Sequence, residues 1–290
     1  MKIKTTLVLI IITVIFDTQI HAQGTFITVG GGYGYCGAPV QPITNYSGTA
    51  NNNGSGYTNN YNLLKGSGSY GKGIQASGTL GYMFSENLGA ELSIGYLHGG
   101  KFIRKESDIS STYISINEIS TYGRMLRFTP ALRMSVGKGK IRPYMRMGLV
   151  IGVGAKLTVD SIRKYDDLYL VTNGSWETVT KYSGGISLGF ASGLGADFKC
   201  NERYSFYMEL GFITQSWAPE KSLITKYLDN GVNELSTFTT YQKETEYLDN
   251  YTEDTGSFDS SVPQKQLKFY FPFSSVGINV GLHISLGGKK

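Results

Sequence analysis

Large apolar residues alternate with small or polar residues in eight segments of the chain. In Leu88–His98, for example, Leu92 and Ile94 alternate with Glu91 and Ser93. A period of two residues is typical of a β-strand with two different faces. Each segment is long enough to cross a bilayer as a tilted strand, which needs about nine to eleven residues. The segments are Gly24–Tyr35, Gly73–Phe84, Leu88–His98, Arg124–Val136, Ile141–Ala155, Gly184–Phe198, Tyr204–Gln215 and Phe269–Leu286.

The less apolar face of these segments decides between two all-β architectures. A soluble β-sandwich would also alternate, with its polar residues facing solvent. Here that face is dominated by Gly, Ser and Ala and carries only a few charges. Small residues suit the narrow interior of a barrel better than a solvated surface, which would carry many Lys and Glu. The pattern therefore favours a barrel whose apolar face points outward.

The connectors between the segments alternate strictly in length. Residues 85–87, 137–140 and 199–203 are tight turns, whereas residues 36–72, 99–123, 156–183 and 216–268 are long. Outer-membrane barrels have short periplasmic turns, long outer loops and an even strand number. We therefore predict an all-β fold, an eight-stranded antiparallel up-and-down transmembrane β-barrel with long extracellular loops.

A count of ten strands is the alternative, because Asn173-Gly174 lies between two β-prone runs and is a strong hairpin signal. Leu168–Thr172 is too short to span a bilayer, so we interpret this region as a hairpin that continues above the membrane. The same interpretation applies to Leu235–Tyr247.

The N-terminus has the features of a secretory signal. A basic start, Met1–Lys4, precedes the apolar run Leu7–Phe16, and Ala22 supplies a small residue before the expected cut. We predict a signal peptide at residues 1–22 and one outer-membrane β-barrel domain at residues 23–290. No later stretch of about 18 apolar residues predicts a transmembrane helix.

Composition adds weight to the β assignment and limits the candidate partners. The chain has 38 Gly, 21 Tyr and 14 Phe but only 7 Pro, and a helical protein would be richer in Ala, Leu, Glu and Lys. A net charge of +5 is too small to indicate nucleic acid. The two cysteines are expected at opposite ends of the barrel, Cys36 outside and Cys200 in a periplasmic turn, too far apart for a disulfide.

This combination of features resembles the small outer-membrane β-barrel superfamily, which is porin-like and OmpA/OmpX-like. The resemblance covers about residues 23–286 and includes the Gly-rich opening strand Phe26–Tyr35. It is one of pattern rather than of a specific motif, and the chain lacks the terminal aromatic residue found in many members. It implies an outer membrane of a Gram-negative bacterium, with outer-membrane lipids and lipopolysaccharide as the surroundings.

Charged residues on the small-residue face predict an ionic cluster inside the barrel. Counted from the short turns, Glu91, Arg133, Arg146 and Glu209 lie at similar heights, and Arg127 faces the same interior. Buried charges are tolerable only when paired, and an Arg on the lipid face would cost about 2–4 kcal/mol near the midplane. The structural interpretation is a plug that fills the lumen, as expected in an eight-stranded barrel. The functional alternative is a gated polar path or an active site.

No catalytic, cofactor-binding or metal-binding set emerges from the sequence. Some outer-membrane lipid deacylases use a His and a Ser on the outer face of a barrel, and His98 occupies such a position, but no supporting motif accompanies it. Belts of aromatic residues are expected at both membrane interfaces. The inner belt would contain Tyr82, Phe84, Phe198 and Tyr204, and the outer belt Tyr33, Tyr35, Tyr96 and Phe269.

The long connectors are the remaining candidates for function. Residues 36–72 mix Tyr, Asn, Ser and Gly as recognition surfaces do, a composition that also fits disorder. Residues 216–268 are acidic in a basic chain, which fits cation or partner binding or a solvated, flexible loop. Three hypotheses follow: a non-enzymatic barrel for envelope structure or for recognition and adhesion through these loops, a narrow channel or transporter for small solutes, and a lipid-modifying enzyme.

Overall fold

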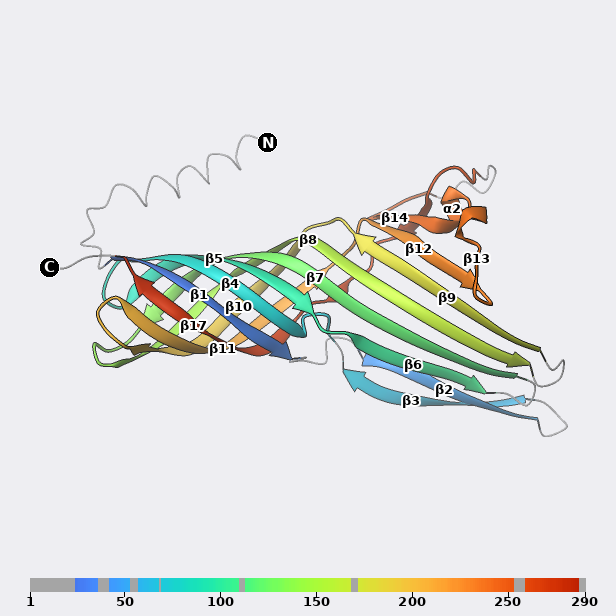
Figure 1. Ribbon diagram of the computed structural model, residues 1–290, viewed down its shortest axis with the longest axis horizontal. Helices are drawn as coiled ribbons and strands as arrows, with labels where there is room; N and C mark the ends of the chain where they lie inside the picture. The colour runs from blue at the N-terminus through green and yellow to red at the C-terminus, as the bar shows by residue number, and fades with distance from the viewer. Residues whose placement is uncertain are drawn as a thin grey trace.

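The computed structural model describes residues 24–35, 42–52, 57–67, 69–109, 113–167, 172–252 and 259–286. The predicted signal peptide, Cys36 and residues 253–258 lie outside the described residues. Eight antiparallel strands close into a ring in chain order (Figure 1). They are β1 (Gly24–Tyr35), β4 (Gly73–Met83), β5 (Leu88–Gly99), β7 (Tyr113–Ser135), β8 (Ile141–Asp167), β10 (Ser187–Lys199), β11 (Tyr204–Trp217) and β17 (Ser275–Ser285). The predicted eight-stranded up-and-down barrel is confirmed.

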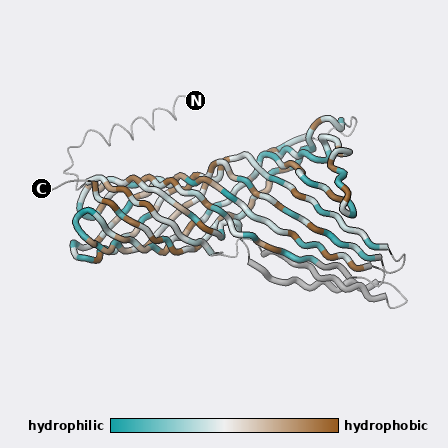
Figure 2. Tube along the Cα trace, in the orientation of Figure 1, coloured by the Kyte–Doolittle hydropathy of each residue, from teal (hydrophilic) through white to brown (hydrophobic). Residues whose placement is uncertain are grey.

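The outer wall of the barrel is apolar and exposed. On β8, the outward side chains of Met147 and Leu149 are 43% and 62% exposed, whereas the inward side chain of Tyr144 is buried. Similar outward side chains cover every barrel strand, and brown apolar positions recur around the barrel in Figure 2. A soluble protein rarely exposes so large an apolar surface. The side chains thus form the lipid-facing belt of a membrane-spanning barrel.

The barrel has two unlike ends. The three short turns lie at one end of the barrel, together with the start of β1 and the end of β17. We call this end the turn end. At the other, the loop end, β7 and β8 run far past the belt and carry an extension sheet (Figure 1). Its other strands are β2 (Pro42–Asn52), β3 (Tyr57–Ser67), β6 (Phe102–Ile109), β9 (Thr172–Ser183), β12 (Lys221–Asp229), β13 (Val232–Asn233), β14 (Glu244–Leu248) and β15 (Gln264–Leu267).

The extension sheet corrects the picture of long flexible loops. Residues 42–67 contribute the β2–β3 hairpin, and β9 pairs with β8 on one side and β12 on the other. The β8–β9 hairpin above the membrane is confirmed, but its turn was misplaced. Asn173 and Gly174 lie within β9, opposite Asp166 and Tyr165, and the turn falls at residues 168–171, outside the described residues.

The hairpin expected at Leu235–Tyr247 is wrong. That stretch contains the short 3-10 helix η1 (Leu235–Thr237), helix α2 (Thr240–Lys243) and β14. The hairpin lies earlier, where Asn230 and Gly231 both have positive φ and join β12 to β13. Positive φ at both central residues is the requirement of a type I′ turn, which favours Asn-Gly. None of the helices in the described ranges is long and apolar enough to cross a bilayer.

The last barrel strand is shorter than the sequence predicts. Strand β17 begins at Ser275, whereas the predicted segment begins at Phe269. The residues between, including β16 (Phe271–Pro272), turn inward across the loop end, so that Phe273 is fully buried. This inward turn places an apolar core at the junction of barrel and extension sheet.

Candidate functional site: the barrel interior and its closure

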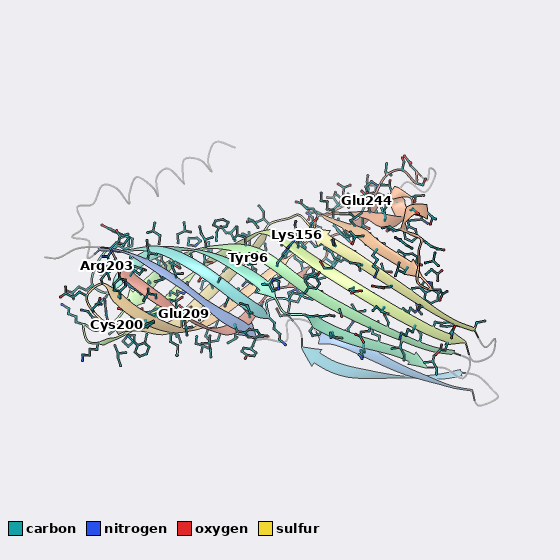
Figure 3. The ribbon with its side chains drawn as sticks, viewed as in Figure 1. Tyr96, Lys156, Cys200, Arg203, Glu209 and Glu244 are labelled. Carbon is teal, nitrogen blue, oxygen red and sulfur yellow. The ribbon has the colours of Figure 1, made fainter. Side chains whose placement is uncertain are left out.

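A two-point ion pair lies at the centre of the lumen. Arg146 on β8 donates from Nε to Glu209 Oε2 at 2.6 Å and from Nη2 to Oε1 at 2.8 Å. Asn279 Nδ2 and the Tyr144 hydroxyl donate to the same carboxylate, at 3.1 and 3.2 Å. Figure 3 labels Glu209 within the barrel. Parallel bonds between a guanidinium and a carboxylate are short, strong and directional, so this pair fixes β8 relative to β11 over the inner face of β10, the strand between them.

A second arginine extends the pair into a network. Arg133 on β7 stands directly opposite Arg146 across the β7–β8 ladder, an arrangement that is repulsive when unrelieved. Glu91 lies between them, 3.1 Å from Arg146 Nη1 and 3.7 Å from Arg133 Nη1. Arg133 Nη2 also donates to Asp197 Oδ2 at 2.6 Å. Three carboxylates therefore neutralise the two opposed guanidinium groups.

The small residues of the inner wall make room for this network. A Cβ built on Gly193 would lie 2.7 Å from the Glu209 carboxyl carbon, and one on Gly195 would lie 2.6 Å from the Tyr144 ring. The Arg133 guanidinium stacks over that ring at 3.7 Å. These glycines on β10 thus leave room for large polar side chains that project from the two neighbouring strands, β8 and β11.

The structure brings together four of the five residues predicted for the lumen cluster: Glu91, Arg133, Arg146 and Glu209. The fifth, Arg127, lies nearer the loop end, where it donates to Gln215 Oε1 at 2.9 Å and to the Phe273 carbonyl at 3.0 Å. It is six residues from Arg133 on the same strand, about 20 Å at about 3.3 Å per residue. Placing Arg127 in the ionic cluster was therefore wrong, although its inward direction was right.

Asp197 is the member that the sequence reasoning left out. Its inward parity was recognised, but its distance from its own turn placed it below the cluster. Strand tilt moves neighbouring strands relative to one another, and Asp197 thereby reaches Arg133. Its other oxygen lies 3.8 Å from His283 Nδ1 at the turn end.

Only small spaces remain inside the barrel. A cavity of about 60 Å³ lies between Arg127 and Arg146, and one of about 20 Å³ lies beside Glu209. A water molecule occupies about 30 Å³ of liquid. A larger recess of about 200 Å³ sits at the turn end around Arg142, Asp197 and His283. The lumen is therefore divided by side chains.

An apolar core closes the loop end. Leu97, Met125, Leu157, Trp217 and Phe273 are each 0% or 1% exposed and pack together with Ala155. The Trp217 indole donates from Nε1 to the Gly184 carbonyl at 2.8 Å, so its one polar atom is satisfied. This core, which we call the loop-end plug, lies directly above Arg127 and its partner carbonyl at Phe273.

Stacked aromatic rings connect the loop-end plug to the extension sheet. Phe271 contacts Trp217, Phe269 and Tyr182, and Tyr182 contacts Tyr247. Burial raises the pKa of Tyr182 to about 12, and the neighbouring Tyr247 acts in the same direction. The prediction that Phe269 belongs to an outer aromatic belt was wrong, because its ring packs within this cluster.

The remaining candidate residues lie apart from the interior. His98 is exposed, and its direct cross-strand neighbours are Ile74 and Arg124. Cys200 is a free, exposed thiol in a turn-end loop, and its predicted lack of pairing stays a prediction because Cys36 is outside the described residues. Within the described ranges, no group of three or more His, Cys, Asp or Glu side chains is placed to hold a metal ion.

Comparison with known proteins finds similarity among solved structures alone. No protein-family model matches the sequence, and no curated protein matches it. Among solved structures, the outer membrane protein OprG from Pseudomonas aeruginosa is similar at 17% sequence identity and a TM-score of 0.37, covering 94% of this chain and 100% of OprG. The closed ring of eight strands and its exposed apolar belt are by themselves enough to give this chain the architecture of an outer-membrane β-barrel.

Proposed function

We propose that this protein is a non-enzymatic outer-membrane barrel of a Gram-negative bacterium that holds an extracellular β-sheet for surface recognition or adhesion. In this account the turn end faces the periplasm and the loop end faces outward, as short turns and long loops do in bacterial barrels. The predicted signal peptide would direct the chain to export. The barrel then acts as an anchor, and the extension sheet acts as the working surface.

The closure of the barrel is the observation that carries the proposal. Two separate layers fill the lumen: the network around Arg146 and Glu209, and the loop-end plug around Trp217 and Phe273. A conducting pore would need a continuous polar path past both. In the lower layer, carboxylates pair with Arg133 and Arg146, and the side chains of the upper layer are apolar, so such a path would have to cross an ion-paired layer and an apolar one.

The extension sheet supports the recognition role. Its strands are paired along a length that anchoring a barrel in a membrane does not require. Strands β7 and β8 stay paired from Ser135 and Tyr144 to Tyr113 and Asp167. Ion pairs brace the outer parts, between Lys105 and Glu118 at 3.1 Å and between Lys226 and Glu177. A preformed surface loses less conformational entropy on binding a partner than a flexible loop does.

Residues 36–72 and 216–268 are the proposed contact regions. The second region carries the acidic side chains predicted from the sequence, and the described ones among them lie on β12 and β14 or in the segments that flank and connect these two strands. Its acidic character favours a basic or cation-bridged partner.

The proposal can be tested in living cells by separating the sheet from the barrel. One variant replaces residues 221–267 with a short Gly-Ser linker and keeps the Phe269–Phe273 segment that closes the loop end. Cells that display equal amounts of the variant and of the intact protein are compared for cell-to-cell aggregation and for attachment to an epithelial monolayer. We expect both properties to fall when this part of the sheet, β12–β15, is removed.

The channel hypothesis predicts a different pattern in the same strains. Uptake of small antibiotics would depend on the barrel, and attachment would be the same with and without the sheet. That result would overturn the recognition role.

A further inference from the structure

A pocket of about 890 Å³ lies on the outward face of the sheet, just beyond the lipid-facing belt. Its walls are formed by β7, β8, β9, β12 and β14 (Figure 3, where Lys156 and Glu244 are labelled). The volume falls within the range of small-molecule sites, about 300–1,000 Å³. This pocket is separate from the lumen and plays no part in the closure described above.

Four cations line one side of the pocket. Arg124 and Lys156 stand directly opposite each other on β7 and β8, and Ser183 on β9 separates Lys156 from Lys221 on β12. Lys181 lies one position further out, opposite Thr158. Neighbouring strands are about 4.8 Å apart, so these side chains form one compact basic wall.

Among the residues that the structure describes, the cations of the basic wall have no carboxylate within ion-pair distance, whereas several other cations of the extension sheet do. Arg104, Lys105, Lys226 and Lys268 each form an ion pair with a nearby carboxylate. Within the described residues, none of the four wall cations does so. Like charges directly opposite each other on paired strands are destabilising. An arrangement of this kind is therefore suited to an anionic group that comes from outside the chain.

The side of the pocket next to β14 is acidic and adjoins the basic wall at Lys221. Glu246 on β14 stands opposite Lys221, and Glu244 stands opposite Leu223. Glu220 joins them from the connection before β12. Three carboxylates against four cations make the pocket strongly dipolar but almost neutral in sum. A ligand that carries both an anionic and a cationic group complements both walls.

The height of the pocket above the lipid-facing belt indicates that such a ligand would come from the membrane. On β7, Arg124 is two residues beyond the outward Leu126, and on β8, Lys156 is three residues beyond the outward Val153. Exposed Tyr122 lines the pocket, and the 69% exposed Ile186 follows Ser183. Two or three residues correspond to at most about 10 Å along a strand, which is the level of lipid headgroups above a hydrocarbon core.

We propose that this pocket binds the headgroup of a membrane lipid that carries a phosphate and a primary amine, as phosphoethanolamine does. The phosphate accepts hydrogen bonds from Arg124, Lys156, Lys181 and Lys221, and the ammonium donates to Glu244 and Glu246. The acyl chains lie along the apolar belt below. This inference goes beyond surface recognition and requires only that the barrel spans the membrane.

The experiment measures lipid retention by the full-length protein. The protein is reconstituted in nanodiscs of phosphatidylethanolamine, phosphatidylglycerol and phosphatidylcholine in equal amounts, transferred to mild detergent, and analysed by native mass spectrometry. We expect phosphatidylethanolamine to be retained at least several-fold over the other two lipids. Equal retention of all three lipids, or retention of none, would overturn the proposal.

Substitutions in each wall test which part of the headgroup that wall binds. Lys156→Gln with Lys181→Gln should abolish retention of phosphatidylethanolamine, whereas Lys105→Gln with Lys226→Gln, which alters paired lysines elsewhere on the sheet, should not. Glu244→Gln with Glu246→Gln should remove the preference for phosphatidylethanolamine over phosphatidylglycerol. A preference that survives either pocket variant contradicts the assignment. Each variant is first shown to keep its barrel by its resistance to unfolding in detergent without heating.

Retention of lipid is independent of the recognition role. A protein that loses the lipid can still mediate attachment, and a protein that does not mediate attachment can still retain the lipid. The two proposals therefore fail separately.

Discussion

Arg146 and Glu209 join β8 and β11 over the intervening strand β10 through two hydrogen bonds, of 2.6 and 2.8 Å. Both side chains come from strands whose outward residues are apolar and exposed, so the pair lies in a region that has no bulk water on its outer side. The pair therefore contributes to filling the lower lumen. Its removal gives the first prediction.

Arg146→Met should lower the free energy of unfolding by about 3–5 kcal/mol, because Glu209 then lacks its cation and Glu91 loses one of two. Adding Glu209→Leu should recover part of this loss, since an apolar pair avoids the desolvation of charge. Urea unfolding in lipid vesicles, followed by tryptophan fluorescence, measures both. Lys138→Met is the control, because its pair with Glu86 is exposed and such pairs contribute about 0–1 kcal/mol. Equal stabilities for wild type and Arg146→Met would refute a structural role for the pair.

Two glycines on β4 test the packing of the inner wall. A Cβ on Gly81 would lie 2.0 Å from the Phe26 ring, whereas a Cβ on Gly78 meets nothing within 4 Å. Gly81→Ala should therefore destabilise the barrel by about 1–3 kcal/mol, the usual cost of overpacking. Gly78→Ala should be neutral or slightly stabilising, because alanine reduces the freedom of the unfolded chain. The same unfolding assay compares them, and equal effects would show that the interior is not filled at this level.

Trp217 tests the loop-end plug. Trp217→Ala should cost about 3–5 kcal/mol, as large-to-small changes of buried aromatic residues do. The chain has two tryptophans, and the other, Trp176 on β9, is only partly buried against Tyr165. Trp176→Ala should therefore have a clearly smaller effect in thermal unfolding. Two variants of equal stability would contradict the burial difference on which the plug rests.

Ionisation of Tyr182 makes the contact between the loop-end plug and the extension sheet depend on pH. Burial raises its pKa to about 12, compared with about 10 for an unperturbed tyrosine. Because the folded-state pKa is raised, the unfolded chain ionises first. The stabilisation is then complete below about pH 10 and is lost as the pH rises through about 12.

The measurement is an alkaline titration of tyrosinate absorbance in the wild type and in Tyr182→Phe. The difference between the two curves should titrate near pH 12, and proteolysis of the extension sheet should increase over the same interval. A difference curve centred near pH 10 would mean that Tyr182 is solvated and does not connect the two parts.

The transmembrane part of the fold could be predicted from the sequence because each strand has two chemically distinct faces. Outward Leu, Ile, Met and Phe alternate with inward Gly, Ser and charged residues, and this period of two fixes both strand and face. The extension sheet has water on both sides, so its residues show no such contrast. Residues 113–123 and 156–167 therefore read as loop, although β7 and β8 continue through them.

The same limit applies to the candidate site. Direction into the lumen follows from parity, which is why Glu91, Arg133, Arg146 and Glu209 were found. Contact around the ring depends on strand tilt and stagger, which no single strand reveals. For that reason Asp197 was missed and Arg127 was placed with the wrong partners. The outward pocket was missed because its walls come mostly from three connectors that are far apart in the sequence.

The most direct test of the closed barrel is single-channel recording of the full-length protein in planar lipid bilayers. Two filled layers predict no steady conductance above the bare bilayer, and Trp217→Ala alone should not create one, because the network around Arg146 and Glu209 remains below the plug. A large, steady conductance from the wild-type protein would contradict the closed barrel and favour a channel.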